Sequence, residues 1–161
     1  MRVAVRAILL AGLVSACSLV GDRPSAVKAT FKALAHLGYS CDAGEKELGP
    51  PNGLFQWHCN RANKGPAMNV LVEGNDRGVA TFIIGIDDTD PALVRQEFSR
   101  ILAEVPPISS APWIADGLDG WTGPQASRVV HGIRVTGVCD ATQCMVFISN
   151  AADPIEPLPL P

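Results

Sequence analysis

The sequence lacks the short motifs that would assign it to a common enzyme class. Its 161 residues contain no Gly-x-Ser-x-Gly elbow, no glycine-rich phosphate loop and no Cys-x-x-Cys pair. These absences argue against an α/β-type serine hydrolase, a phosphate-loop nucleotide-binding protein and a thiolate zinc site. The three histidines, His36, His58 and His131, stand far apart in the chain. We therefore expect no enzyme activity, no cofactor and no metal.

Positive charge and long apolar runs are scarce as well. The formal net charge is −3, and no run of basic residues occurs. This balance argues against nucleic acid or an anionic lipid surface as an electrostatic partner. The uncharged run from Ala7 to Gly21 has 15 residues, which is short of the ~20 that a membrane-spanning helix needs.

The N-terminus carries the most informative pattern. Arg2 and Arg6 precede the short apolar run, and an aliphatic residue and two small residues occupy positions 14–16, directly before Cys17. A basic start, a short apolar segment and small residues are typical of a secretory signal. Together with Cys17, residues 14–16 resemble the lipobox of bacterial lipoproteins. The resemblance implies cleavage before Cys17, diacylglycerol on its thiol and a further acyl chain, such as palmitate, on the new amine.

Ordinary signal cleavage is the competing interpretation, because small residues before a cleavage site suit that peptidase too. The number of cysteines favours the lipoprotein: the five cysteines are 17, 41, 59, 139 and 144. An exported domain tends to pair its cysteines, and lipid on Cys17 leaves an even number. We expect residues 1–16 to be a cleaved signal peptide and residues 17–23 a lipidated tether. Cleavage would remove two arginines and bring the net charge to −5. Which membrane holds the protein, and on which face, stays open.

The four remaining cysteines predict two disulfides. Cys139 and Cys144 flank four polar or small residues, and a four-residue hairpin loop would place them opposite each other. Cys41 and Cys59 are then partners by elimination. Their bridge would tie the end of the first helix to the first strand, with a loop-closure contribution of about 3 kcal/mol.

The order of predicted elements indicates an α+β domain over residues 24–150. Helix and strand periodicities predict two helices packed on a mostly antiparallel sheet of about five strands, in the order α-β-β-β-α-β-β. A partly barrel-like sheet around the second helix is the alternative. The final stretch, 151–161, is rich in proline and is expected to be a disordered tail. The predicted helices span 24–37 and 91–105, and the predicted strands span 54–59, 67–73, 79–86, 128–139 and 144–150.

Local signals support both helices. Asp22 or Ser25 is a candidate N-cap of the first helix, and Gly38 suits the left-handed position after its end. Pro91 suits the first position of the second helix, with Asp90 as its cap. The acidic cluster at 87–90 lacks the spacing of a calcium loop, so we interpret it as helix capping.

The long loop over 106–128 carries the most suggestive side chains. Loops on rigid scaffolds often bind partners, and tryptophan is enriched in binding hot spots. Trp113 and Trp121 are therefore candidate protein contacts. The competing interpretation is that both rings fold back and cover the edge of the core.

These observations favour an exported protein, held to a membrane by lipid on Cys17, with a disulfide-stabilised α+β domain. We expect a non-catalytic binding or structural module with an envelope protein as partner. An envelope hydrolase whose site is assembled only in the fold, and a small-ligand carrier, are the alternatives.

Overall fold

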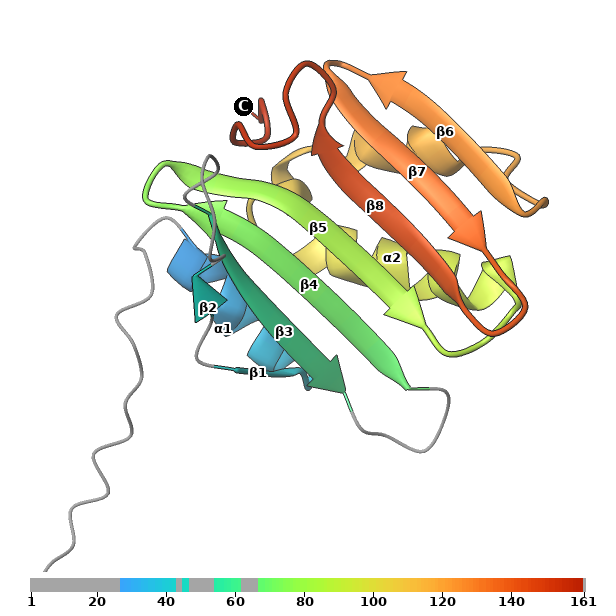
Figure 1. Ribbon diagram of the computed structural model, residues 1–161, viewed down its shortest axis with the longest axis horizontal. Helices are drawn as coiled ribbons and strands as arrows, with labels where there is room; N and C mark the ends of the chain where they lie inside the picture. The colour runs from blue at the N-terminus through green and yellow to red at the C-terminus, as the bar shows by residue number, and fades with distance from the viewer. Residues whose placement is uncertain (1–26, 43–44, 47–53, 62–66, 161) are drawn as a thin grey trace, which may run out of the picture.

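The computed structural model describes residues 27–42, 45–46, 54–61 and 67–160, and all structural statements below concern these residues. Helices cover one face of a single sheet, and Figure 1 views the molecule from the other face. The elements are α1 (Lys28–His36), β1 (Ser40–Cys41), β2 (Glu45–Lys46), β3 (Phe55–Arg61), β4 (Met68–Asn75), β5 (Gly78–Ile86), α2 (Pro91–Glu104), the short 3-10 helices η2 (Ile108–Ser110) and η3 (Pro112–Leu118), β6 (Gln125–Val130), β7 (Ile133–Cys139) and β8 (Cys144–Asn150).

The sheet is antiparallel throughout and runs in the order β1-β3-β4-β5-β8-β7-β6, with β2 paired to β3. Two three-stranded meanders, β3-β4-β5 and β6-β7-β8, therefore meet where β5 pairs with β8. The α+β class is confirmed. The sheet is open, so the barrel-like alternative is wrong, and five strands was an undercount.

The prediction missed the two-residue strands β1 and β2, and it joined β6 and β7 into one strand across the turn between them. We expected one strand over 128–139, but the chain reverses at His131 and Gly132, whose φ angles are +46° and +81°. Positive φ at both central residues is the geometry of a type I′ turn, which matches the twist of the flanking strands. Val130 and Ile133 are then cross-strand partners. His-Gly is a weaker sequence signal for this turn than Asn-Gly, so the pattern read as a continuous strand.

The core lies between the sheet and the helices. A row of inward side chains crosses the sheet from β3 to β8, with Trp57, Val72, Phe82 and Ile148 as successive cross-strand neighbours. The ring of Phe31, on α1, meets Trp57 edge-on at 5.2 Å between centroids. From α2, the buried apolar side chains are those at the helical spacing that predicted this face: Val94, Phe98, Ile101 and Leu102.

The end of α1 and the start of α2 have the residues that the sequence predicted for these positions. Gly38 follows α1 with φ +88°, and the Tyr39 N–H donates back to the Leu34 carbonyl at 2.9 Å. At the start of α2, Asp90 accepts a hydrogen bond from the Ala92 N–H at 2.8 Å. Pro91 occupies the first turn of that helix. The predicted start of the first helix at residue 24, and its candidate caps, lie outside the described residues.

The C-terminal segment differs from the disordered tail that its prolines suggested. Residues 151–160 follow a defined path, and Leu158 is only 8% exposed. The Leu158 N–H donates to the Val79 carbonyl at 2.9 Å, and the Asn150 side chain donates to the Pro157 carbonyl at 3.2 Å. Pro154, Pro157 and Pro159 have no N–H to donate, and their rings restrict the backbone of the segment. Here the sheet supplies the partners and the apolar surface that order it.

Candidate functional site

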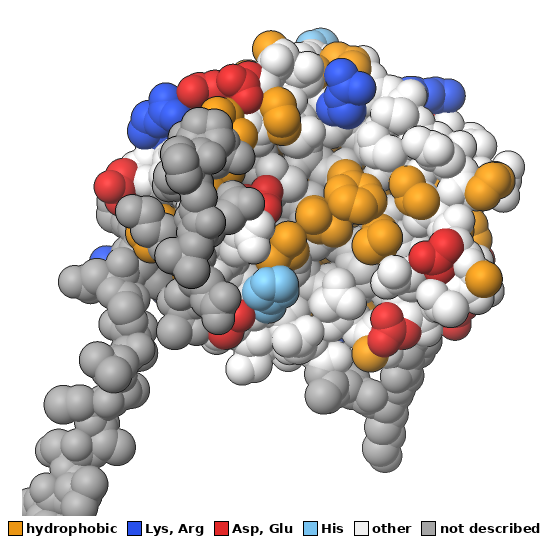
Figure 2. Space-filling view, viewed as in Figure 1, with side chains coloured by type: hydrophobic (Ala, Val, Ile, Leu, Met, Phe, Trp, Pro, Cys, Tyr) orange, Lys and Arg blue, Asp and Glu red, His pale blue; other side chains and the backbone are white. Residues whose placement is uncertain are grey.

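The face of the sheet opposite α1 and α2 is the candidate functional surface, called the open face below. Leu71, Ile83 and Phe147 are direct cross-strand neighbours on β4, β5 and β8. One pair further along the strands, Met145 of β8 is the neighbour of Val138 of β7. These five residues form the apolar strip, visible in Figure 2 as an orange band across the middle of the molecule.

Each side chain of the apolar strip is only half-buried. No helix or strand among the described residues lies over them, as Figure 1 shows. Next to the strip, the Asn69 side chain lies over Gly85, where a Cβ would collide with the Asn69 carboxamide. The strip is therefore a shallow, continuous surface with polar groups at its margins.

The folded C-terminal segment bounds one side of the strip. The Thr81 hydroxyl, on the open face of β5, donates to the Pro154 carbonyl at 3.4 Å and is almost fully covered. Arg77, in the turn before β5, makes an exposed ion pair with Glu156 at 3.0 Å. The side chains of the strip begin one pair below Thr81, so the C-terminal segment forms a low wall above them.

Carboxylates lie on the other side of the strip. The alternation of open-face positions on β5 runs from Ile83 through Gly85 to Asp87, and on β7 it runs through Val138 to Asp140. Asp87 and Asp140 are both exposed. Hydrogen bonds from the Thr142 N–H and hydroxyl, and from the Gln143 N–H, lower the pKa of Asp140 below its ordinary value. This carboxylate therefore stays charged in mildly acidic solution.

A cluster of three polar side chains is buried between β3, α2 and the segment after α1. Arg61 donates two hydrogen bonds to the Glu97 carboxylate, at 2.7 Å and 2.8 Å, and the Tyr39 hydroxyl donates to it at 2.8 Å. The Arg61 guanidinium also lies 5.1 Å from the Tyr39 ring centroid and donates to the sulfur of Met68. Arg61 and Glu97 are 7% and 5% exposed. Burial, and then the bond to Glu97, raise the pKa of Tyr39 well above its ordinary value.

This buried cluster stabilises the fold. All three polar groups satisfy one another, and they connect the segment after α1 to the last residue of β3 and to α2. Bidentate pairing of arginine with a carboxylate is among the strongest side-chain interactions when it is desolvated. Sequence reasoning missed the cluster because its members are 22 to 58 positions apart and none stands in a motif.

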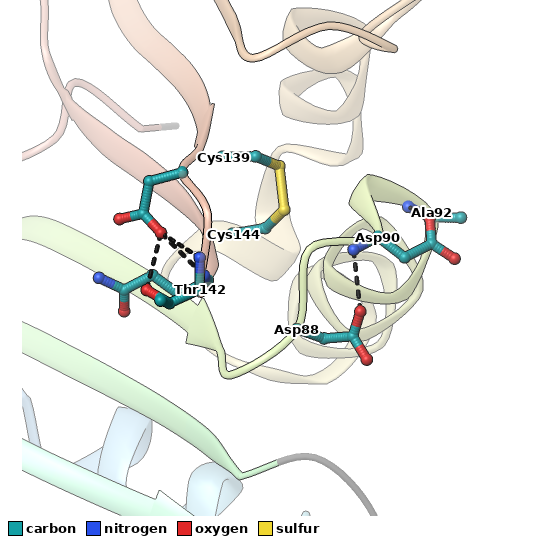
Figure 3. Close-up of a disulfide and its surroundings, with 8 residues drawn as sticks. Asp88, Asp90, Ala92, Cys139, Thr142 and Cys144 are labelled. Carbon is teal, nitrogen blue, oxygen red and sulfur yellow. Dashed lines mark hydrogen bonds between the residues drawn. A yellow bond between two sulfur atoms is a disulfide. The ribbon is translucent and has the colours of Figure 1, made fainter.

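Both predicted disulfides are present. Cys41 of β1 bonds to its cross-strand partner Cys59 of β3, and Cys139 bonds to Cys144 across the turn between β7 and β8. Figure 3 shows the second bridge beside the loop that leads into α2. The pairing by elimination is therefore confirmed. Cys17, the predicted lipid attachment site, lies outside the described residues.

The two tryptophans of the long loop have different environments. Trp121 is 1% exposed, and its ring lies against Gly137 of β7, where any Cβ would collide with it. Its indole Nε1 has no hydrogen-bond partner among the described residues. The prediction that Trp121 contacts a partner is therefore wrong, because its ring fills the core beneath β7. Trp113 is half-buried, with its ring 4.7 Å from that of His131.

The remaining candidates are dispersed. Within the acidic cluster, Asp88 and Asp90 accept backbone N–H groups at the start of α2, as capping requires (Figure 3). His36 lies on the exposed side of α1, and His58 lies on the open face of β3. Among the described residues, no three His, Cys, Asp or Glu side chains gather as a metal site would require.

A hollow of about 300 Å³ lies between α1 and the end of α2, on the side of the helices away from the sheet. Ala29, Ala33 and Pro106 supply its apolar floor, and Lys32 and Glu104 its charged rim. It is a surface depression, whereas carriers enclose their ligands in deeper cavities. The open face differs from this hollow, because it is a continuous sheet surface over which no helix or strand of the described residues lies.

The pattern of apolar residues in the sequence indicated part of the apolar strip. The pattern over 79–86 is apolar on both faces and predicted a central strand, which is confirmed, since β5 lies between β4 and β8. Only the sheet order shows that Leu71 and Phe147 flank Ile83 on the uncovered side.

No helix in the described part of the chain is long and apolar enough to cross a membrane. Comparison of the sequence with models of protein families and with curated proteins, and of the fold with solved structures, finds no match.

Proposed function

We propose that this protein is a lipid-anchored, non-catalytic binding module of the cell envelope, and that its contact surface is the open face of its sheet. The address rests on the lipobox-like residues 14–16 and on Cys17. The two disulfides support export, because such bonds persist in oxidising compartments.

The apolar strip carries the proposal of a binding surface. Antiparallel sheets that face water on one side alternate apolar and polar residues along each strand. On β4, β5 and β8 that alternation fails at Leu71, Ile83 and Phe147, which are apolar and lie side by side. A partner that removed about 200 Å² of apolar surface from water here would gain about 5 kcal/mol. That gain offsets at most the lower end of the roughly 4–15 kcal/mol that association costs, so contacts at the polar margins must supply the rest of the affinity.

One feature favours binding over catalysis. The most strongly interacting titratable side chains, Tyr39, Arg61 and Glu97, satisfy one another inside the core. Because Arg61 and Glu97 are buried there, neither is presented to a substrate at the surface.

Photo-crosslinking in intact cells tests the proposal. A photoreactive amino acid at Ile83 should give a discrete protein adduct in the membrane fraction. The same residue at Val129 is the matched control, since Val129 is on the open side of edge strand β6, outside the strip, and 57% exposed. Adducts at Val129 but not at Ile83 would refute the contact surface.

The anchor is tested separately. Cys17→Ala should release the protein from the membrane fraction or block its maturation. Unchanged membrane partition and unchanged electrophoretic mobility of this variant would refute lipidation.

A further inference from the structure

The direction of the apolar strip constrains the shape of what binds it. The strip crosses the strands from β4 to β7, which spans three inter-strand spacings, or about 14 Å. The neighbouring side chains Leu71, Ile83 and Phe147 therefore recur at about 5 Å along it. On one face of an α-helix, side chains at i, i+4 and i+7 recur at a similar spacing, and about ten residues cover 14 Å. A helix of about three turns fits the strip lengthwise.

Acidic side chains lie at both margins of the strip, and one of these margins also carries a basic side chain. Asp87 and Asp140 lie beyond one long side of the strip, at the ends of β5 and β7. Arg134 is the one basic residue at the open-face positions of the four strands β4, β5, β7 and β8. It lies along the opposite side, in the row of Thr81, and Glu73 of β4 lies in the same row. Figure 2 shows red side chains both below the band and towards the upper edge, where the blue side chains lie.

We propose that the apolar strip binds a cationic amphipathic helix of a partner protein, with the helix axis across the strands and its basic flank over Asp87 and Asp140. This inference rests on the proposed function and specifies the chemistry of the partner. Apolar residues at i, i+4 and i+7 contact the strip, which is the helix-in-groove mode of recognition. Lysine or arginine on one flank pairs with the two carboxylates. Opposed charges of this kind favour a cationic partner over an anionic one.

An anionic lipid surface is the competing ligand for an exposed apolar strip. Lipid phosphates would lie against Asp87 and Asp140, and like charges at an interface oppose binding. Asp140 keeps its charge, because the turn bonds of Thr142 and Gln143 lower its pKa. The margin of the strip thus favours a cationic protein segment.

Two synthetic helical peptides test the proposal. Both carry leucine at i, i+4 and i+7 on an alanine-rich background; one has three lysines on a single flank, and the other has three glutamates there. Fluorescence anisotropy with the purified full chain should show at least tenfold tighter binding of the lysine peptide. The preference should shrink in 0.5 M NaCl, since salt screens exposed charges.

Variants assign the binding to the strip. Ile83→Ser should weaken the lysine peptide at least fivefold, and Val129→Ser, the same kind of change outside the strip, should leave it unchanged. Asp87→Asn combined with Asp140→Asn should bring the two peptides within about twofold of each other. Asparagine at 140 keeps an oxygen that accepts from Thr142 and Gln143, so the turn is retained. Matching melting temperatures would show that each variant is folded.

The outcomes separate this inference from the proposed function. Equal affinity of the two peptides, or no binding of either, overturns the cationic helix. Adducts from Ile83 in cells would in that case leave the contact surface standing. Flotation of the Cys17→Ala chain with phosphatidylglycerol vesicles, if lost on adding Ile83→Ser, would overturn the inference in favour of a lipid ligand.

Discussion

Replacing Arg61 by methionine is expected to destabilise the fold by about 3–5 kcal/mol, because it leaves the carboxylate of Glu97 buried without its main partner. The side chains of this pair are 7% and 6% exposed, and Arg61 makes two of the hydrogen bonds that the carboxylate accepts. Tyr39 would retain one bond to Glu97, and Arg100 would remain 3.7 Å away. Domains of this size have unfolding free energies of about 5–15 kcal/mol, so the loss is large.

The same physics predicts that the double variant Arg61→Met with Glu97→Leu recovers most of the loss. Replacing a buried ion pair by apolar side chains of similar volume is often neutral, because the desolvation cost disappears together with the attraction. We expect a coupling of at least about 2 kcal/mol between the two positions. Urea unfolding followed by circular dichroism measures the natural protein, the two single variants and the double variant. Adding Tyr39→Phe to the double variant removes the hydroxyl that would be left without a partner.

Arg77→Met is the matched control. This variant makes the same change in the ion pair between Arg77 and Glu156, whose side chains are 62% and 44% exposed. Exposed pairs contribute about 0–1 kcal/mol, so this variant should be nearly as stable as the natural protein. A loss below about 1 kcal/mol for Arg61→Met, or additive losses in the double variant, would refute the account of the buried cluster.

Four further outcomes follow from the structure. Trp121→Ala should lower the free energy of unfolding by about 3–5 kcal/mol. Trp121→Phe also removes the unpartnered indole N–H and should lower it by about 1 kcal/mol. Equal losses in thermal melts would contradict the packing of this ring. Tyr39 is the single tyrosine, so absorbance at 295 nm should show no ionisation near pH 10 until the protein unfolds, and normal titration in urea. Stability should then fall as pH rises above 10, because the unfolded chain loses the phenolic proton that the folded state keeps. Replacing both cysteines of the 41–59 bridge by alanine should cost about 3 kcal/mol, against about 2 for the 139–144 bridge; the reverse order in urea melts would count against loop length as the cause. Leu158→Ala should cost about 2 kcal/mol, and no change in melting temperature would show that the C-terminal segment adds nothing to the core.

Local chemistry made several features readable in the sequence. Gly38 and the Asp90-Pro91 pair mark helix ends because left-handed φ and capping depend on the residues at those positions alone. The 139–144 disulfide follows from a short hairpin loop, and the 41–59 pairing then follows by exclusion. Apolar residues alternate in 55–59 and 68–72, and Trp57, Cys59, Val70 and Val72 of these two runs are buried, because a strand exposes opposite sides in turn.

Other features depend on residues that only the fold brings together. The single strand predicted over 128–139 became β6 and β7, since a His-Gly turn is decided by the twist of the strands that it joins. The C-terminal segment is ordered by partners on β5 and β8, and its own composition does not show that these are available. Trp121 is buried because Gly137 leaves room for its ring on β7.

By itself the sequence determined the class of fold, the core faces and both disulfides, because each depends on near neighbours, periodicity or the count of cysteines. Only the tertiary structure decided that β5 pairs with β8. That pairing joins Leu71 and Ile83 to Phe147 and makes the apolar strip. It likewise took the packing of α2 on the sheet to bring Glu97 to Arg61. Contacts between distant segments are selected by the free energy of the whole fold, and no local pattern in the chain encodes them.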